Sequence, residues 1–334
     1  MTMNLLITWQ YSPERIALVQ SKLTTPWSIA CAAPDAPGFA RALREADAVM
    51  AMGWCGNMPA APRLRLVHLP GAGYDEVDFA AVPPDCAVCN VYEHEIGIAE
   101  YVVLGMLEWE IRLARCDTEL RRGSWASGFI TGAPLHGELH GKTVGFVGYG
   151  RIAHETARRL RAFGLRIMAR TRTPSRCDPE VVDDAAGVER LDDMLAHCDY
   201  VVVTCPLTSA TRGLIGRRQL DAMPAHAVIV NVARGEVIDE QALHDALAER
   251  RIGGAIIDTW YRYPTTGDPA EVCLPSRLPF HELDNVIMSP HCSGWSAGLL
   301  DRRWTVIAGN LDALARGEPL RNVLQAPGGP PPAD

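Results

Sequence analysis

The stretch GKTVGFVGYGRIAHETARRLRAFG, residues 141–164, is the clearest indication of the fold class of this chain. A short apolar run, Thr143–Val147, leads directly into a glycine turn, and a helical pattern follows the turn. Gly148 allows the tight turn, Gly150 lets the backbone come close to a pyrophosphate, and the small Ala153 lets the helix pack closely on the strand. The free N–H groups at the start of that helix would meet the phosphates. The stretch therefore predicts a dinucleotide-binding βαβ unit, and the alternative is an ordinary tight turn.

Short apolar runs alternate with helical patterns along most of the chain. This alternation is typical of βαβ units and of a parallel sheet covered on both faces. We expect an α/β protein with two doubly wound parallel sheets, a Rossmann dinucleotide-binding domain and a flavodoxin-like substrate domain, with a ligand cleft between them. The predicted substrate domain comprises residues 1–97 and 294–324, the dinucleotide-binding domain comprises residues 98–293, and residues 325–334 are expected to form a disordered tail. The predicted strands include Asn4–Thr8, Leu64–Leu69, Thr143–Val147, Arg166–Ala169, Tyr200–Thr204, Ala227–Val232, Gly254–Asp258 and Val286–Met288.

The end of the strand that follows the glycine turn and its helix indicates which dinucleotide is bound. Sites for NAD usually carry Asp or Glu about 20 residues after the glycines, where the carboxylate accepts a hydrogen bond from the ribose 2′-hydroxyl. Here the corresponding segment is Arg170-Thr171-Arg172, which holds no carboxylate. Arginine binds a 2′-phosphate through charge-assisted hydrogen bonds, so the segment favours NADP(H) over NAD(H). The alternative is a solvated loop with ordinary surface arginines.

Composition argues against several classes of protein. The 334 residues carry a formal net charge of -8 without a long run of one sign, so we expect no nucleic acid partner. No stretch approaches the ~20 apolar residues that span a bilayer, and the N-terminus lacks the pattern of a secretory signal, so we expect a cytoplasmic protein without a membrane partner. The 10 cysteines include one C-x-x-C pair, Cys86 and Cys89, whose side chains would point to opposite faces of a strand. We therefore expect no metal site.

Several further segments agree in order and spacing with one family. They are the run CDYVVVTCPLTSATRGLIGRRQLDAMPAHAVIVNVARGEVIDEQAL at residues 198–243, SPHCSGW at residues 289–295 and the loop PGAGYD at residues 70–75. Together with GYGRIA they resemble the D-isomer-specific 2-hydroxyacid dehydrogenases, which include glyoxylate/hydroxypyruvate reductases and phosphoglycerate dehydrogenases. The resemblance implies an oxidoreductase that moves a hydride between NADP(H) or NAD(H) and a small 2-oxo or 2-hydroxy acid. It also implies a homodimer, with the segment around residues 99–125 in the interface.

The resemblance assigns roles to residues at the ends of predicted strands. Arg234 would bind the substrate carboxylate and carbonyl oxygen, and His291 would donate a proton to that oxygen or remove it in the reverse direction. Backbone N–H groups around Ala72 and Gly73 would hold the carboxylate, and Asp258 would contact the nicotinamide carboxamide. Without the resemblance, Arg234 would equally suit a cap or the surface, and His291 the core. The other residues expected to line the cofactor are Gly148, Tyr149, Gly150, Arg151, Ile152, Cys205, Pro206, Thr211, Val232, Ala233 and Gly294.

One position departs from the family pattern. The family usually has a Glu before a proline, five residues after the position of Asp258, and this Glu hydrogen-bonds the catalytic histidine and raises its pKa. Here the position is Tyr263, followed by Pro264. A neutral tyrosine can orient an imidazole but cannot stabilise the imidazolium as a carboxylate does, so we expect a lower pKa for His291 than in relatives with the Glu. Tyr263 is therefore included among the predicted catalytic residues.

Two further residues are candidates for substrate contact. His94 stands where the family commonly has asparagine, and it is either a polar contact to substrate or a solvated turn residue. Trp54 ends a predicted strand of the first domain, and it is either a wall of the substrate pocket or a core residue.

Two other functions stay open. The missing Glu is compatible with a donor such as formate or phosphite, because formate oxidation releases no alcohol proton and needs no general base. A nucleotide-sensing binding protein of the same fold is the second alternative. The retained Arg234 and His291 favour catalysis.

Overall fold

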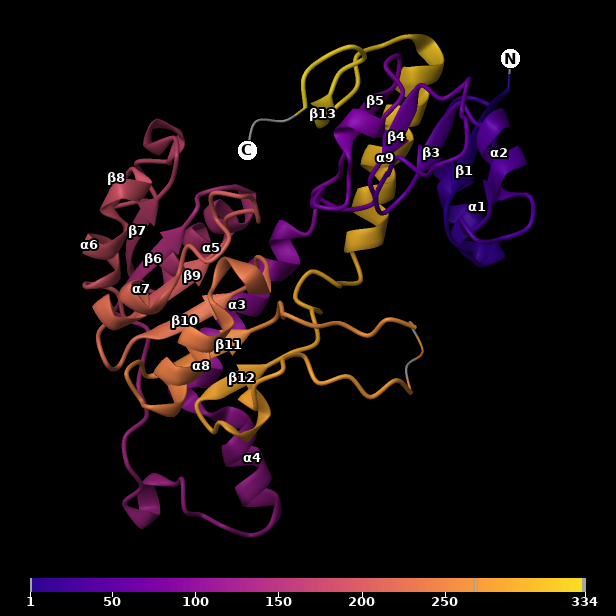
Figure 1. Cartoon of the computed structure of the whole chain (residues 1–334). Coiled ribbons are helices and arrows are strands. Elements are labelled where there is room, and N and C mark those ends of the chain that lie inside the picture. Colours follow the sequence, from indigo (N-terminus) through magenta and orange to yellow (C-terminus); the bar gives the residue numbers. More distant parts are fainter. Residues whose placement is uncertain (1, 267, 269, 332–334) are drawn as a thin grey trace. The chain divides into compact units, whose positions relative to one another are not determined.

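The computed structural model describes residues 2–266, 268 and 270–331, and its chain forms two compact units. The first unit comprises Met1–Glu93 and Ser296–Asp334, and the second comprises His94–Trp295. Each unit holds one mainly parallel sheet with helices packed on it (Figure 1). The expected α/β class with two parallel sheets is confirmed, whereas the roles and boundaries given to the two domains stay predictions.

The elements of each unit follow one another as βαβ units. Those of the first unit are β1 (Met3–Ile7), α1 (Pro13–Lys22), β2 (Trp27–Cys31), α2 (Phe39–Glu45), β3 (Ala48–Met50), β4 (Leu66–His68), β5 (Ala87–Cys89), α9 (Leu299–Arg316) and β13 (Val323–Gln325). Those of the second unit are α3 (Glu95–Ile111), α4 (Leu113–Arg121), β6 (Thr143–Val147), α5 (Arg151–Ala162), β7 (Arg166–Arg170), β8 (Asp184–Ala186), α6 (Leu191–Leu195), β9 (Tyr200–Val203), α7 (Arg217–Ala222), β10 (Val228–Asn231), α8 (Glu240–Ala248), β11 (Gly254–Ile257) and β12 (Val286–Met288). Within the described ranges, no helix combines the length and the apolar character needed to cross a membrane.

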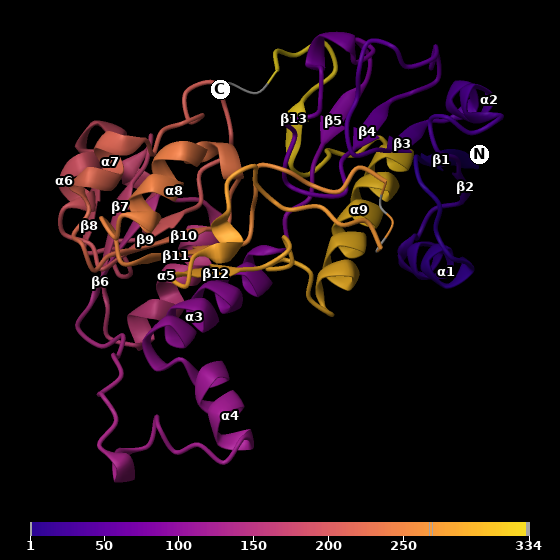
Figure 2. The same ribbon diagram turned by 60° about the horizontal axis from the view of Figure 1, so that its bottom comes forward.

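The sheet of the first unit has the strand order β13-β5-β4-β3-β1-β2. Its strands run parallel, apart from β13, which pairs antiparallel with β5. Strands β3, β4 and β5 are buried along their length because the sheet is covered on both faces. Val19 of α1 and Trp304 of α9 pack on one face, and Phe39 and Leu43 of α2 pack on the other. Figure 2 shows α9 lying along this sheet.

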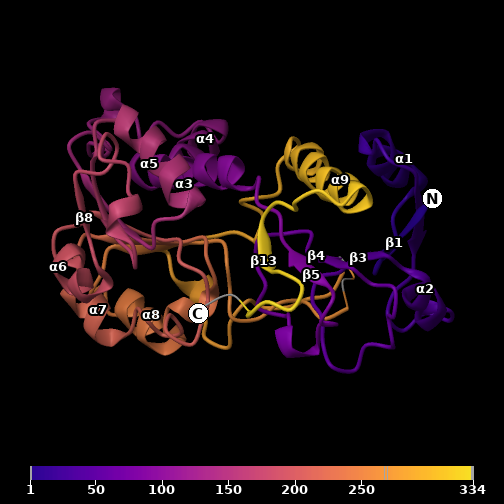
Figure 3. The ribbon, with the colours of Figure 1, turned by 90° about the horizontal axis from the view of Figure 1, so that it is seen from above.

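The sheet of the second unit has the strand order β12-β11-β10-β9-β6-β7-β8, and its strand pairs are parallel. Helices α3 and α5 cover one face, whereas α6, α7 and α8 cover the other. Figure 3 shows α3 and α5 on one side of this sheet and α7 and α8 on the opposite side. Helix α3 comes close to the sheet at Gly105, where a Cβ would lie 3.0 Å from Cγ2 of Ile256.

Helix α4 and the residues after it extend away from the sheet of the second unit (Figures 1 and 2). All residues of α4 are described, and none of them is buried. Large apolar side chains along this extension face solvent, with Phe129 91% exposed and Leu135 99% exposed. Exposed apolar groups of this size usually mark an interaction surface.

The tail expected from residue 325 starts inside a strand. Gln325 pairs with Val88 in the β13–β5 ladder, and Gly328 N donates a hydrogen bond to Pro84 O at 2.7 Å. The prediction is therefore wrong for the start of the segment, because β13 completes an edge of the first sheet and anchors the chain up to Gly328. Residues 332–334 lie outside the described residues.

Candidate active site

Three predicted site residues follow neighbouring strands of the second unit. Arg234 lies shortly after β10, Asp258 directly after β11 and His291 shortly after β12. These strands are adjacent and parallel, so their carboxyl ends meet at one edge of the sheet. Both Asp258 and Arg234 act electrostatically on His291. The structure thus brings these three side chains into one cluster.

The carboxylate of Asp258 holds the loop that carries His291. Its Oδ1 accepts hydrogen bonds from Ser289 Oγ at 2.5 Å and Cys292 N at 2.9 Å, and its Oδ2 accepts one from Ser293 N at 3.0 Å. Burial alone would raise the pKa of Asp258, but these hydrogen bonds outweigh burial and hold the pKa below its ordinary value. Asp258 is fully buried and holds this loop, and its contact with the nicotinamide carboxamide stays a prediction.

His291 is held in a conformation that few residues adopt. Its φ of 56° lies in the left-handed region, which costs a residue with a Cβ about 1 kcal/mol or more. Hydrogen bonds to Asp258 on both sides of the histidine keep the chain in this shape. Partial loss of water around the imidazole lowers the pKa of His291; Asp258 opposes this shift and Arg234 adds to it. A lower pKa is also the direction expected from the missing glutamate.

Tyr263 packs against His291 through its ring. The two ring centroids are 5.6 Å apart, with the planes tilted by 51°. The Tyr263 hydroxyl accepts a hydrogen bond from Trp260 N at 3.0 Å, which fixes the side chain. Burial raises the pKa of Tyr263, so its hydroxyl stays neutral. Tyr263 therefore occupies a place beside the histidine but offers it a ring instead of a carboxylate.

A buried asparagine sets the turn that carries Arg234. Asn231 Nδ2 donates to Arg234 O at 3.0 Å, and Asn231 Oδ1 accepts from Ala233 N at 3.1 Å. Gly235 lets the chain pass Trp260, since a Cβ on this glycine would lie 2.5 Å from a backbone atom of the tryptophan. The turn thereby keeps the guanidinium at the carboxyl end of β10, where Nη1 donates to Ala233 O at 2.8 Å.

The glycine turn after β6 has the shape that a dinucleotide needs. Gly148 has a φ of 85°, and a Cβ there would lie 2.8 Å from Cα of Cys205. A Cβ on Gly150, in contrast, would meet nothing within 4 Å, so the chain is open on that side. Helix α5 starts at Arg151, and its first N–H groups have no acceptor within the helix. Ala153 is fully buried, so α5 packs closely on the sheet. The free N–H groups at the start of this helix fit a pyrophosphate.

Arg170 does not lie where the sequence predicts it. Its side chain is 0% exposed, and Nη2 pairs with Asp184 Oδ2 at 2.9 Å while Nε donates to Arg190 O at 3.0 Å. A guanidinium enclosed in this way cannot reach a 2′-phosphate, so the prediction for Arg170 is wrong. Thr171 and Arg172 come next in the chain, and the arginine is exposed.

The other residues predicted to line the cofactor are mostly packed into the second unit. Thr211 Oγ1 donates to Pro206 O at 2.6 Å and so shapes the loop after β9. Burial raises the pKa of the Cys205 thiol to about 11, which keeps it protonated. Arg151 pairs with Glu95 at 3.7 Å. Cys205, Val232 and Ala233 are buried, and Tyr149 and Ile152 are partly buried against the core below α3 and α5.

His94 lies beside the loop of His291. It stands at the start of α3, and a Cβ on Gly294 would lie 3.3 Å from the Cβ of His94. The glycine therefore lets the histidine loop come close to the beginning of the helix. His94 is partly buried there, and both interpretations, a polar contact to substrate and a solvated turn residue, stay open.

The loop PGAGYD of the first unit presents backbone N–H groups in one direction. Gly71 O accepts from Val91 N at 3.2 Å, and Ala72 O accepts from Asn90 Nδ2 at 2.8 Å. In a trans peptide the N–H points away from the preceding C=O, so the N–H of Ala72 points away from Val91 N and the N–H of Gly73 points away from the side chain of Asn90. The carboxylate contact expected of these two N–H groups stays a prediction.

Trp54 and the C-x-x-C pair have mainly structural surroundings. Trp54 is buried and its Nε1 donates to Ala81 O at 3.0 Å, although the residue also lines a pocket of the first unit. Burial raises the pKa of the Cys86 and Cys89 thiols to about 12. Over the described ranges, no group of three or more His, Cys, Asp or Glu side chains is arranged to hold a metal ion.

Several polar residues that position the site escape prediction from the sequence. Tyr101 bonds to Ser289 at 2.7 Å between their hydroxyl oxygens, which extends the support of Asp258 to helix α3. Asn90 and Asn231 each hold a turn directly after or at the end of a buried strand. Their signal in the sequence is a lone polar residue at the end of an apolar run.

Comparison with known proteins gives one consistent family. The family model described as "D-isomer specific 2-hydroxyacid dehydrogenase, NAD binding domain" matches residues 103–293. The chain is 33% identical over 275 residues to a D-3-phosphoglycerate dehydrogenase of Methanocaldococcus jannaschii, covering 80% of this chain and 48% of that protein. It is 34% identical over 265 residues to a glyoxylate reductase of Thermococcus gammatolerans, covering 77% of this chain and 75% of that protein. The chain thus spans about half the length of the first of these relatives.

Solved structures show the same architecture. The 2-hydroxyacid dehydrogenase of Ketogulonicigenium vulgare matches with a TM-score of 0.79 and 27% identity, covering 98% of this chain and 99% of that chain. The agreement therefore extends over both units, beyond the residues that the family model matches.

Proposed function

The chain belongs to the D-isomer specific 2-hydroxyacid dehydrogenase family, and from this premise we propose that it reduces a small 2-oxo acid to the 2-hydroxy acid with a nicotinamide cofactor. The observation that carries the proposal is the cluster at the ends of β10, β11 and β12, where Asp258 holds the loop of His291 beside Arg234. A cationic side chain and a titratable imidazole at one edge suit a substrate with a carboxylate next to a carbonyl.

Each residue has a role that its surroundings support. When bound at the glycine turn, the cofactor would supply or accept the hydride. Arg234 would bind the substrate carboxylate and polarise the carbonyl oxygen through its fixed guanidinium fork. His291 would give its proton to that oxygen, and Tyr263 would hold the imidazole by ring packing. The N–H groups of Ala72 and Gly73 would bind the carboxylate.

We further propose that NADP(H) is preferred over NAD(H). The support is the segment after β7, where Arg172 is exposed next to Thr171 and no carboxylate is present to accept from a ribose 2′-hydroxyl. The loss of Arg170 from the proposed contacts leaves Arg172 as the cation of this segment that would meet a 2′-phosphate.

The experiment that tests the function is steady-state oxidation of NADPH and NADH with a panel of 2-oxo acids from glyoxylate to phenylpyruvate. We expect turnover with at least one acid and a higher kcat/KM with NADPH. Tight cofactor binding without turnover of any 2-oxo acid would contradict the proposal and would favour a nucleotide-sensing protein.

A second candidate function rests on Tyr263. Because this residue offers no carboxylate to His291, the site also suits formate, whose oxidation releases no alcohol proton and needs no general base, and phosphite is the second donor to be tested. Reduction of NADP+ or NAD+ by either donor, at a rate above that of any 2-hydroxy acid, would support the second candidate instead.

We also propose that the protein is a homodimer. The extension formed by α4 and the residues up to 137 exposes Trp125, Phe129, Ile130 and Leu135, which a second copy would cover. The double variant Phe129→Asp, Leu135→Asp should give a monomer in size-exclusion chromatography with light scattering. A wild-type protein that is monomeric in this measurement would contradict the proposal.

A further inference from the structure

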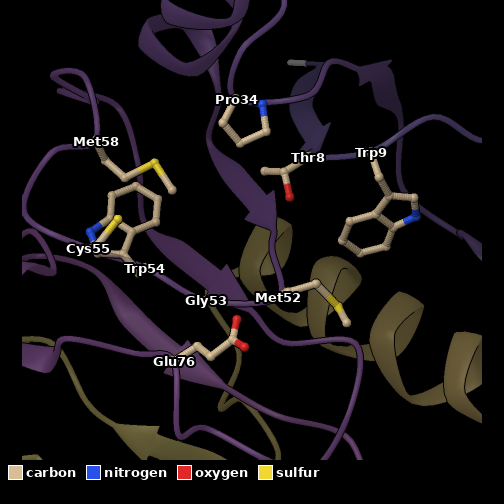
Figure 4. Close-up of a pocket in the computed structure, with 9 residues that line it drawn as sticks. All are labelled: Thr8, Trp9, Pro34, Met52, Gly53, Trp54, Cys55, Met58 and Glu76. Atoms are coloured by element: carbon tan, nitrogen blue, oxygen red, sulfur yellow. The ribbon is translucent and has the colours of Figure 1, made fainter. Parts of the chain in front are cut away.

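A pocket of about 640 Å³ lies in the first unit at the carboxyl end of its sheet. Figure 4 shows Thr8 and Trp9, which follow β1, on one side, and Gly53 and Trp54, which follow β3, on the other. The chain continues in opposite directions from these two neighbouring strands, since β2 lies beyond β1 while β4 and β5 lie beyond β3. Sheets of this kind bind ligands at such a change of direction, and small-molecule sites commonly measure about 300–1,000 Å³.

The walls of the pocket are apolar. They include the two indole rings of Trp9 and Trp54, the thioethers of Met52 and Met58, and Pro34 (Figure 4). Trp54 is fixed by the hydrogen bond of its indole N–H, whereas Met52 is 66% exposed at the rim. A rigid aromatic wall facing flexible methionines suits an apolar group of variable shape.

The pocket carries negative charge and no positive charge. Glu76 is one of its nine lining residues, and none of the nine, all of them described, is Lys, Arg or His. Figure 4 shows the carboxylate of Glu76 at the edge of the pocket, beside Gly53. A ligand group with its own negative charge is therefore disfavoured here.

The pocket adjoins the loop that would hold the substrate carboxylate. Trp54 N donates to Glu76 O at 3.1 Å, and Asp78 N donates to Trp54 O at 2.8 Å. Glu76 directly follows the loop of residues 70–75, and a Cβ on Gly53 would lie 2.5 Å from Glu76 O. The wall that carries Trp54 is therefore bonded to the end of the loop that carries Ala72 and Gly73.

We infer that this pocket receives the side chain of the 2-oxo acid and selects a large, uncharged apolar side chain, branched aliphatic or aromatic. The inference rests on the proposed function, because it takes the loop of residues 70–75 as the carboxylate site. The inference excludes glyoxylate as the preferred substrate, because glyoxylate has no side chain to fill the pocket. It also excludes acids with a second carboxylate or a phosphate.

The first experiment compares kcat/KM for the reduction of glyoxylate, pyruvate, 2-oxobutanoate, 4-methyl-2-oxopentanoate, phenylpyruvate and 2-oxoglutarate. Each methylene buried in an apolar pocket should raise kcat/KM about fourfold, so 4-methyl-2-oxopentanoate should exceed pyruvate by more than tenfold. 2-Oxoglutarate should be the poorest of the larger acids. If glyoxylate or pyruvate is the best substrate, the inference is overturned while the proposed function stands. If no 2-oxo acid is reduced, both fail.

The second experiment reverses the charge of the pocket. Glu76→Lys should raise the ratio of kcat/KM for 2-oxoglutarate to that for 4-methyl-2-oxopentanoate by roughly tenfold. Glu45→Lys is the matched control, because it makes the same change at the amino end of β3, and it should leave the ratio unchanged. Equal ratios in both variants would overturn the inference.

A third measurement does not depend on turnover. Titration with 4-methyl-2-oxopentanoate should change the intrinsic tryptophan fluorescence, and Trp9→Phe should remove a large part of this change. A change that is identical in Trp9→Phe and in the wild type would show that the acid does not enter this pocket, and would overturn the inference.

Discussion

The two ends of one sheet in the second unit use buried charges in opposite ways. At β7, the guanidinium of Arg170 is turned into the protein and bonded to Asp184, so it holds the edge strands together. At β11 and β12, the carboxylate of Asp258 is equally buried, but its hydrogen bonds hold the loop that presents His291 at the surface of the unit. A buried charge at the end of a strand thus serves a functional site when its hydrogen-bond partners lie in the segment with the reactive group. It serves only the stability of the fold when they do not.

The largest effect should come from the loop that Asp258 holds. His291→Gln removes the proposed proton donor and should lower kcat for 2-oxo acid reduction by about 10²–10⁴-fold. Because His291 is exposed, the free energy of unfolding should change little. Steady-state kinetics and urea denaturation measure the two effects. A kcat within tenfold of the wild type would remove the histidine from the proposed role.

Loss of the buried guanidinium at β7 should act on stability instead. Arg170→Leu leaves the carboxylate of Asp184 and the carbonyl of Arg190 without their partner, and should lower the free energy of unfolding by about 3 kcal/mol. The Kd for NADPH of the folded variant should stay close to that of the wild type. Urea denaturation measures the stability, and a fluorescence titration measures the Kd for NADPH. A large loss of NADPH affinity with full stability would show that Arg170 serves cofactor binding and not the fold.

The neighbouring exposed arginine should show the converse pattern. Arg172→Ala should weaken NADPH binding by about tenfold and leave NADH binding nearly unchanged, because it removes charge-assisted hydrogen bonds to the 2′-phosphate. Its free energy of unfolding should stay within ~0.5 kcal/mol of the wild type. Equal losses for the two cofactors would show that Arg172 does not read the 2′-phosphate.

The smallest effect concerns the partner of the histidine. Tyr263→Glu places a carboxylate beside His291 and should raise its pKa by about one unit, since an opposite charge stabilises the imidazolium. Tyr263→Phe keeps the ring and should leave the pKa of His291 the same as in the wild type. The pH dependence of kcat/KM of both variants measures this, and an identical profile for Tyr263→Glu and the wild type would show that position 263 does not tune the site.

Much of this architecture follows from the sequence. The run into Gly148 predicts the turn and helix that the structure shows, since glycine alone tolerates that conformation next to Cys205. Arg234 and His291 could be placed together because both follow strands, and parallel strands end at the same edge.

The direction of a side chain could not be predicted in the same way. The sequence alone does not show which of Arg170 and Arg172 is buried. Arg170 is the buried one because it pairs with Asp184, which lies on the strand paired with β7. The role of Asp258 depends on three donors from residues 289–293, far along the chain. The segment that starts at Gln325 has the composition of a disordered tail. Its first residue is ordered because β13 pairs with β5, a tertiary contact that composition does not reveal.

His291, held by Asp258, is proposed to donate the proton during reduction of a 2-oxo acid. Since reduction needs the imidazolium, kcat/KM should fall as pH rises through the pKa of His291, and partial loss of water around the imidazole places that pKa below the ordinary value of about 6.5. The direct test is the pH profile of kcat/KM for the wild type and for His291→Gln. We expect a descending limb centred below pH 6.5 in the wild type that is absent from the variant. The same limb in both proteins would contradict the role of His291 as the proton donor.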